Sequence, residues 1–170
     1  MIGGNKRTVP STGGGWTWTD LRRMNTLLAM AAEYCEDQAA VTKYSAITRF
    51  FRAFFYFEKV KRFGDVPWYN IQLGSADELL YKPRDSRELV MTNMLEDLEY
   101  AITSGGLTES AADPYHVNKW AALALKAQAC LYEGTYRKYH GLEDSEKWLK
   151  ECVAASEELM TDSPYTLVAT

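Results

Sequence analysis

The segment RFFRAFFYFEKVKRFGDVP, residues 49–67, decides the fold that this sequence predicts. It contains six aromatic residues within the eight positions 50–57 and ends in Phe-Gly-Asp-Val-Pro. At helical spacing its apolar side chains cover a broad arc, which is wider than the stripe of an ordinary amphipathic helix. A helix that is apolar around most of its circumference must be covered on two sides. We therefore expect a central helix with a neighbour on each flank.

The polar residues of this helix form one narrow seam. They step along it by 3, 4 and 3 residues, at Arg49, Arg52, Tyr56 and Lys59. We interpret the basic cluster within residues 49–62 as a solvated face, together with cations near the helix C-terminus that complement its dipole. The aromatic residues, Phe54 among them, are expected to lie mostly in the core.

The composition fits one soluble globular domain. The chain has 170 residues, of which 46% are hydrophobic and 25% are charged, enough for a sizeable core. Its formal net charge of −4 argues against nucleic acid as a partner, because phosphate binding needs a basic footprint. The N-terminal residues have no apolar core of a signal peptide, and no apolar run approaches the length of a membrane span.

The cysteines and histidines predict no metal site and no disulfide framework. Cys35, Cys130 and Cys152 are odd in number, far apart and free of Cys-x-x-Cys or Cys/His spacing. Each falls at an apolar position of a helical pattern, which is typical of a small buried hydrophobe. His116 and His140 are isolated. No cofactor is indicated.

Five helices are expected, with no strand pattern. A capping box at residues 17–20 starts the first, which runs to about Cys35, and Asp85 or Ser86 starts the third. The expected ranges are about 42–63 for the second helix, 86–104 for the third, 118–139 for the fourth and 145–162 for the fifth. Gly64 and the Val66-Pro67 pair end the second helix, and a loop follows over residues 68–80.

Several side chains are candidates for a site. The acids Glu96, Asp97 and Glu99 on the third helix are interpreted as a solvated face, not a catalytic pair, because nothing nearby supplies a partner. Trp16 and Trp18 at the entry of the first helix either pack against it or stack on a ligand, and packing is favoured. No arrangement typical of a glycoside hydrolase or a Ser/His/Asp enzyme is present in the sequence.

The second and fourth expected helices echo one another. Arg52-Ala53 aligns with Lys126-Ala127 at an offset of 126 − 52 = 74 residues, which is close to twice the ~34-residue period of tetratricopeptide helix pairs. The pattern Trp120-x-x-Leu123-Ala124 also resembles the opening of that repeat. The sequence therefore predicts an all-α fold of tetratricopeptide-like antiparallel helix pairs in a right-handed helical-repeat scaffold. The final helix would lack its next neighbour and leave apolar surface exposed.

Several segments, in order along the chain, resemble the SusD/RagB family of outer-membrane nutrient-binding lipoproteins. They are WTWTDLRRMN at 16–25, RAFFYF at 52–57, RFGDVP at 62–67, PRDS at 83–86 and VNKWAALALKA at 117–127. The R-A-x-x-Y-F…FGDVP combination is the specific part. The similarity covers residues 16–165, the expected helical domain, between a flexible lead-in at 1–15 and a truncated tail at 166–170.

The resemblance implies a binding protein and not an enzyme. Family members are lipid-anchored at the outer-membrane surface of Gram-negative bacteria and work with a SusC-like TonB-dependent transporter in the uptake of oligo- or polysaccharides. They are several hundred residues long, so we expect this chain to be an internal fragment of the N-terminal half, without the signal peptide or the lipidation cysteine. Trp68 and Tyr69, adjacent aromatics in a loop, are the carbohydrate-binding candidates, although they could instead tuck against the helix ends. A free-standing tetratricopeptide-like adaptor for protein partners is the alternative function.

Overall fold

The computed structural model describes residues 13–113 and 115–166. These residues form five α-helices and one short 3-10 helix, η1, and contain no β-strand. In chain order the elements are α1 (Thr19–Tyr34), α2 (Gln38–Phe63), η1 (Glu78–Tyr81), α3 (Arg87–Thr103), α4 (Lys119–His140) and α5 (Ser145–Asp162). The expected all-α class and the number of helices are confirmed.

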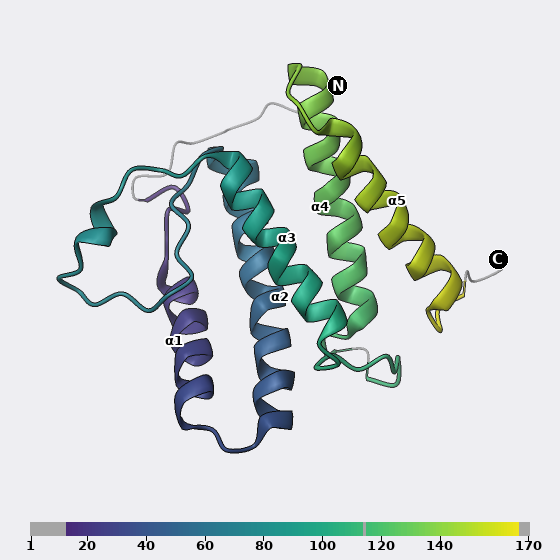
Figure 1. Ribbon diagram of the computed structural model, residues 1–170, viewed down its shortest axis with the longest axis horizontal. Coiled ribbons are helices and arrows are strands. Elements are labelled where there is room, and N and C mark those ends of the chain that lie inside the picture. Colours follow the sequence, from purple (N-terminus) through teal and green to yellow (C-terminus); the bar gives the residue numbers. More distant parts are fainter. Residues whose placement is uncertain (1–12, 114, 167–170) are drawn as a thin grey trace, which may run out of the picture.

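The helices form an antiparallel array in which each packs mainly on its neighbours in the sequence. Figure 1 shows α2 between α1 and α3, with α3 also lying against α4, and α5 covering the other side of α4. The loop between α2 and α3, which carries η1, extends from the side of the array where α1 begins. Most of residues 1–15 and 166–170, the expected lead-in and tail, lie outside the described residues.

The helix starts differ from the sequence prediction in two places. Asp37 accepts hydrogen bonds from the backbone N–H groups of Ala39 and Ala40 at 3.0 Å each, so α2 begins at Gln38 instead of Thr42. The predicted capping box at residues 17–20 is wrong: the residue before α1 is Trp18, and no side chain caps its first turn. A local cap thus lengthens α2 by a turn that apolar periodicity does not show.

The remaining ends follow the expected signals. Ser86, the second of the two predicted caps, accepts from Leu89 N–H at 3.3 Å and starts α3. Asn118 accepts from Ala121 N–H at 2.9 Å and starts α4. Gly64 ends α2 with φ of 71°, and Gly141 ends α4 in the left-handed conformation with φ of 65°. These positive angles suit glycine because it has no Cβ.

The core forms where α2 meets α3, around Tyr56, Phe57 and Val60 of α2. Val90, Met91, Met94 and Leu98 of α3 are fully buried against them. The expected aromatic core is correct for these α2 positions but wrong for Phe51 and Phe54, each of which is 46% exposed. Phe51 and Phe54 lie in a sector of the broad apolar arc of α2 that its neighbouring helices leave partly exposed among the described residues.

The close packing of α4 on α5 depends on a small residue. A Cβ on Gly134 would lie 2.8 Å from Cδ2 of Leu149, so glycine allows the close approach of α4 and α5. Cys130, one turn earlier, is buried, and burial raises the pKa of its thiol to about 12. On the outer side Val153 and Met160 of α5 are exposed. The unpartnered apolar surface expected on the last helix is therefore present.

The sequence similarity between α2 and α4 is matched by similar ion pairs with α3. Arg52 of α2 pairs with Asp97, and the matching Lys126 of α4 pairs with Glu99 at 2.5 Å. Both cations are buried, on opposite flanks of α3. The 74-residue offset thus places equivalent basic residues against the helix between them.

Gly106 lets the segment after α3 cross α2 closely. A Cβ at this position would lie 2.5 Å from the carbonyl oxygen of Thr42 and 2.7 Å from Cβ of Ala46. We expect Gly106→Ala to lower the free energy of unfolding by about 1–3 kcal/mol, because backbone has to move to admit the methyl group. Gly74→Ala is the control, since a Cβ there meets nothing within 4 Å. Urea denaturation of both variants tests this, and equal midpoints would contradict it.

Candidate functional site

The segments FGDVP (63–67) and PRDS (83–86) pair with each other at the two ends of the loop between α2 and α3. Val66 and Asp85 form an isolated antiparallel bridge. Asp65 accepts a hydrogen bond from Arg87 N–H at 2.8 Å, and Asp85 accepts one from Trp68 N–H at 2.7 Å. Each segment thus supplies an aspartate that binds the backbone near the other. These contacts therefore hold the two ends of the loop next to each other.

A buried charge network holds the first part of this loop against the helices. Arg52 donates from Nε and Nη2 to both carboxylate oxygens of Asp97, at 2.6 and 2.7 Å, and from Nη1 to Asn25 at 2.9 Å. Asn25 in turn donates to the carbonyl oxygens of Tyr69 and Ile71 at 2.9 and 3.0 Å. One chain of contacts therefore runs from α3 through α2 and α1 to the loop.

This network corrects two sequence interpretations. The seam on α2 is not solvated: Arg52 is 5% exposed, Tyr56 is fully buried and Lys59 is 8% exposed. Asp97 is 2% exposed and is not part of a solvated face, because its partner comes from another helix. A bidentate Arg–carboxylate pair satisfies both charges inside the protein, which allows polar residues to occupy the buried side of α2.

Trp68 and Tyr69, the predicted carbohydrate-binding residues, lie in different environments. Trp68 is 9% exposed and its ring packs on the ring of Tyr56 at 4.2 Å between centroids. Tyr69 is half-buried, and its hydroxyl donates to the carbonyl oxygen of Leu79 at 2.9 Å. Burial raises the pKa of Tyr69, and burial also raises that of Tyr56, whose hydroxyl accepts from Tyr69 N–H at 2.6 Å.

Tyr69 faces a hollow of about 660 Å³ between the start of α1 and the loop, which we call the loop-side hollow. Trp16 and Trp18 line it together with Tyr69. The Trp18 ring meets those of Trp16 and Tyr69 in edge-to-face geometry, at 5.0 and 6.0 Å between centroids. Both tryptophans also pack against the main core, which is the alternative that the sequence favours for them.

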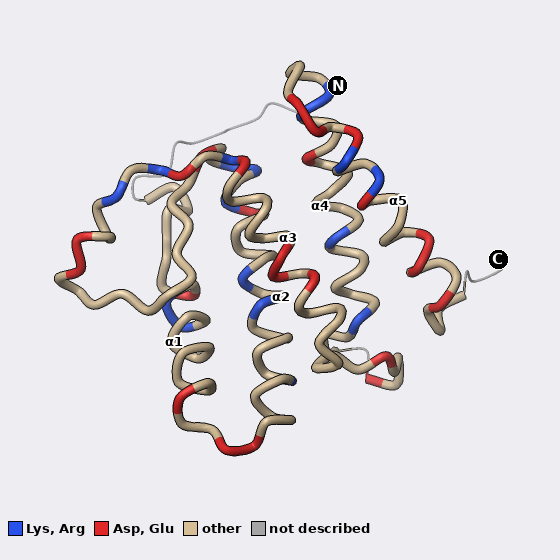
Figure 2. Tube along the Cα trace, in the orientation of Figure 1, with Lys and Arg blue, Asp and Glu red and all other residues tan. Residues whose placement is uncertain are grey.

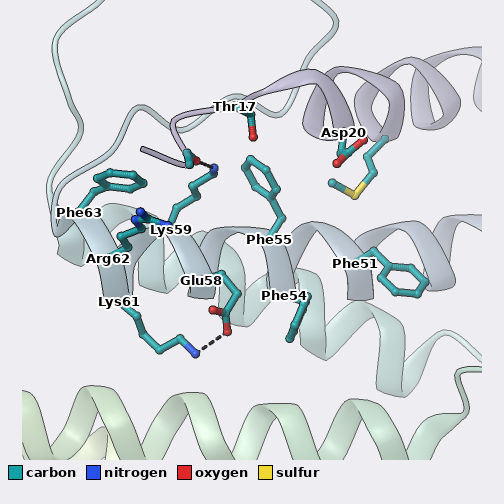
Figure 3. Close-up of a pocket in the computed structure, with 12 residues that line it drawn as sticks. Thr17, Asp20, Phe51, Phe54, Phe55, Glu58, Lys59, Lys61, Arg62 and Phe63 are labelled. Carbon is teal, nitrogen blue, oxygen red and sulfur yellow. Dashed lines mark hydrogen bonds and ion pairs between the residues drawn. The ribbon is translucent and has the colours of Figure 1, made fainter. Parts of the chain in front are cut away.

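A second hollow of about 640 Å³, the α2-side hollow, runs along α2. Figure 3 shows Phe55 and Lys59 pointing from α2 toward the segment that leads into α1, whereas Phe54 and Lys61 lie on the other side of the helix. Lys59 donates to the carbonyl oxygen of Gly15, and burial lowers the pKa of its ammonium group. This hollow is apolar at Phe51 and Phe54 and carries charges of both signs.

The side chains that line these hollows can bind a ligand. Aromatic side chains offer apolar faces, and basic side chains at their edges offer hydrogen-bond donors. Within residues 13–113 and 115–166, no three His, Cys, Asp or Glu side chains come together as metal ligands would.

Comparison with known proteins identifies the family. A family model described as "Starch-binding associating with outer membrane" (SusD-like) matches residues 11–139, which is most of the chain. The chain belongs to the SusD-like family. The SusD-like protein P25 of Formosa agariphila is 23% identical over 157 residues, covering 89% of this chain and 27% of that relative.

Solved structures show the same fold at low sequence identity. A laminarin-binding SusD-like protein has a TM-score of 0.71 and 22% identity, with 89% of this chain and 31% of that chain covered. A structure with xylogluco-oligosaccharide has a TM-score of 0.73 and 23% identity, with 91% and 30% covered. This SusD-like chain thus spans about a third or less of the length of these relatives.

Sequence reasoning missed most of the loop-side hollow of this SusD-like chain. Of its aromatic residues, the sequence predicts Tyr69 as a carbohydrate-binding candidate and favours packing over ligand stacking for Trp16 and Trp18. Three basic residues that line it, Arg22, Lys82 and Arg84, were not singled out. A usable signal was present, because two of them belong to the conspicuous KPRDS segment that follows η1.

Proposed function

We propose that this chain is the helical part of a non-catalytic glycan-binding protein that works with a SusC-like TonB-dependent transporter in oligosaccharide uptake. The observation that carries the proposal is the family match over residues 11–139, with its starch-binding description. Two structural neighbours support it, namely a laminarin-binding SusD-like protein and a structure with xylogluco-oligosaccharide. The ligand here would be an oligo- or polysaccharide.

The loop-side hollow is the proposed glycan contact of this part of the protein. Sugar rings present C–H faces that pack on aromatic rings, and Trp16, Trp18 and Tyr69 supply such rings at one place. The clamped loop and the Arg52 network fix Tyr69 before any ligand arrives, which lowers the entropic cost of binding. Trp68 would act by supporting Tyr56 beneath the loop.

The α2-side hollow and its exposed aromatic residues are the proposed contact for a protein partner. The transporter is the candidate that the family suggests for this partner. Phe51 and Phe54 are large and exposed, lie one turn apart on α2, and line this hollow together with Met24 of α1. Apolar side chains gathered on an open face are typical of interaction surfaces. The alternative function, a protein-interaction adaptor, would use this same face but would not need the loop-side hollow.

We propose the outer-membrane surface as the location, in line with the family description. Among the described residues, no helix combines the length and the apolarity needed to cross a bilayer. A lipid anchor, which the family resemblance implies, would provide the attachment.

Calorimetric titration of the protein with a panel of neutral and charged oligosaccharides tests the proposal. We expect at least one to bind, and Tyr69→Ala to weaken that binding by about three- to tenfold through loss of one aromatic contact. Tyr81→Ala is the matched control, since Tyr81 lies in the same loop and is 85% exposed. Absence of heat with every oligosaccharide would contradict glycan binding and favour the adaptor.

A further inference from the structure

The two hollows differ in the sign of the charge on their walls. The loop-side hollow is lined by Arg22, Lys82 and Arg84 and by no aspartate or glutamate. The α2-side hollow has Asp20 and Glu58 beside its basic residues, so its charges are mixed. Of the two, the loop-side hollow presents an excess of positive charge to whatever enters it.

Two of these cations are held at the rim by the aromatic residues. The guanidinium carbon of Arg84 lies 4.9 Å from the centre of the Trp16 ring, and Nζ of Lys82 lies 5.0 Å from that of Tyr69. A cation over a ring face is attracted by its quadrupole but keeps its full charge. Figure 2 shows basic segments on the part of the loop that returns from η1 to α3. The cations and the aromatic rings thus belong to one arrangement.

Most of this positive charge is not neutralised by the protein. Lys82 shares an ion pair with Asp85 at 2.5 Å and donates to the carbonyl oxygen of Trp68 at 2.8 Å. Arg22 and Arg84 have no carboxylate partner among residues 13–113 and 115–166, although the neighbouring Arg23 pairs with Asp20. Two guanidinium groups are therefore free to bind an anion, and guanidinium binds carboxylate and sulfate-like groups in a two-pronged geometry.

The start of α1 adds to the same effect. Thr19 and Leu21, in its first turn, line the hollow, and the turn has no side-chain cap. The free N–H groups and the positive end of the helix dipole favour a negative group nearby. The cations and the helix start thus attract the same kind of ligand.

We propose that the loop-side hollow binds an acidic saccharide, with the carboxylate of a uronic acid or a sulfate ester placed between Arg22 and Arg84. Trp18, edge-on to its two aromatic neighbours, supplies apolar surface for the adjoining sugar ring. The uronate and the sulfate share the chemistry of an oxyanion on a sugar. This inference rests on the proposed glycan-binding function and names the class of glycan.

Calorimetry with charged oligosaccharides and their uncharged counterparts tests it. The uronate arm compares oligogalacturonides with their methyl esters, and the sulfate arm compares sulfated galactan oligosaccharides with the desulfated forms. We expect one charged form to bind at least tenfold more tightly than its counterpart, and the advantage to shrink between 50 and 500 mM NaCl because salt screens exposed charges. Equal or tighter binding of uncharged forms would overturn the inference and leave the proposed function standing. Failure of every oligosaccharide to bind would overturn both.

A matched pair of arginine variants locates the site. Arg22→Ala and Arg84→Ala should each weaken binding of the charged oligosaccharide about tenfold, because each removes a charge-assisted contact. Arg23→Ala, at the next position on α1 but outside the hollow, should leave binding unchanged. All three side chains are exposed, so melting temperatures should match the parent. Charged-glycan binding that survives both Arg22→Ala and Arg84→Ala would place the site elsewhere and overturn the assignment.

Discussion

Phe57→Ala is expected to lower the free energy of unfolding by about 3–5 kcal/mol, the cost of emptying a large buried aromatic site. Phe57 is 1% exposed and lies in the core between α2 and α3. Its ring also meets Tyr132 of α4 edge-to-face at 5.5 Å between centroids, so the vacated space adjoins three helices. A cavity shared by three helices collapses poorly. The measurement is urea denaturation followed by circular dichroism.

Phe54→Ala is the matched control, one turn earlier on the same helix. The sequence predicted that this change would be as costly as the loss of a buried phenylalanine, but Phe54 is 46% exposed. We now expect a loss of about 1 kcal/mol or less, because only part of the ring is removed from water. Equal losses for the two variants would show that a further partner covers Phe54 in the folded protein.

The length, order and antiparallel arrangement of the helices follow from signals that a single sequence contains. Capping residues, glycine stops and the Val66-Pro67 pair are local, and local rules place most helix ends within a few residues. The side of α2 that faces the core was not predictable in this way. Arg52 is buried because Asp97, 45 residues further along, pairs with it, and periodicity carries no information about such a partner.

The candidate site was also hard to predict, because it combines residues that are far apart in the sequence. Trp16 and Trp18 lie just before α1, whereas Tyr69 and Arg84 come from the two sides of the loop. Sequence reasoning found the aromatic residues one by one and recognised FGDVP and PRDS as separate signatures. The structure shows why both segments are needed: each caps or pairs the backbone of the other, and together they fix the loop that completes the hollow.

The position of the loop depends on charges buried beneath it. Arg52 connects Asp97 to Asn25, and Asn25 holds the carbonyl oxygens of Tyr69 and Ile71. The helical scaffold and the hollow are therefore coupled by one polar network. A substitution of Arg52 or Asp97 should therefore affect both stability and ligand binding. Of the three network side chains, only Asn25 lines the hollow.

Asp97→Ala is expected to destabilise the protein by about 3–5 kcal/mol, because it leaves the buried Arg52 guanidinium without its counter-charge. Glu99→Ala, two positions along α3, is the matched control: that carboxylate is 42% exposed, and its partner Lys126 keeps a second acid, Glu151, at 2.8 Å. The loss there should be about 1 kcal/mol or less, as for other solvated ion pairs. Urea denaturation measures both.

The Asp97→Ala variant also tests whether the Arg52–Asp97 pair only stabilises the fold or positions the loop as well. If Arg52 turns away once Asp97 is gone, Asn25 loses its orienting donor and the backbone at Tyr69 and Ile71 is held less firmly. Hydrogen exchange of amides in residues 68–72 should then quicken in Asp97→Ala under conditions where it is still folded, and not in Glu99→Ala. Glycan affinity should fall in parallel, because part of the binding energy must now order the loop. Unchanged exchange and affinity in a destabilised Asp97→Ala protein would confine the network to stability alone.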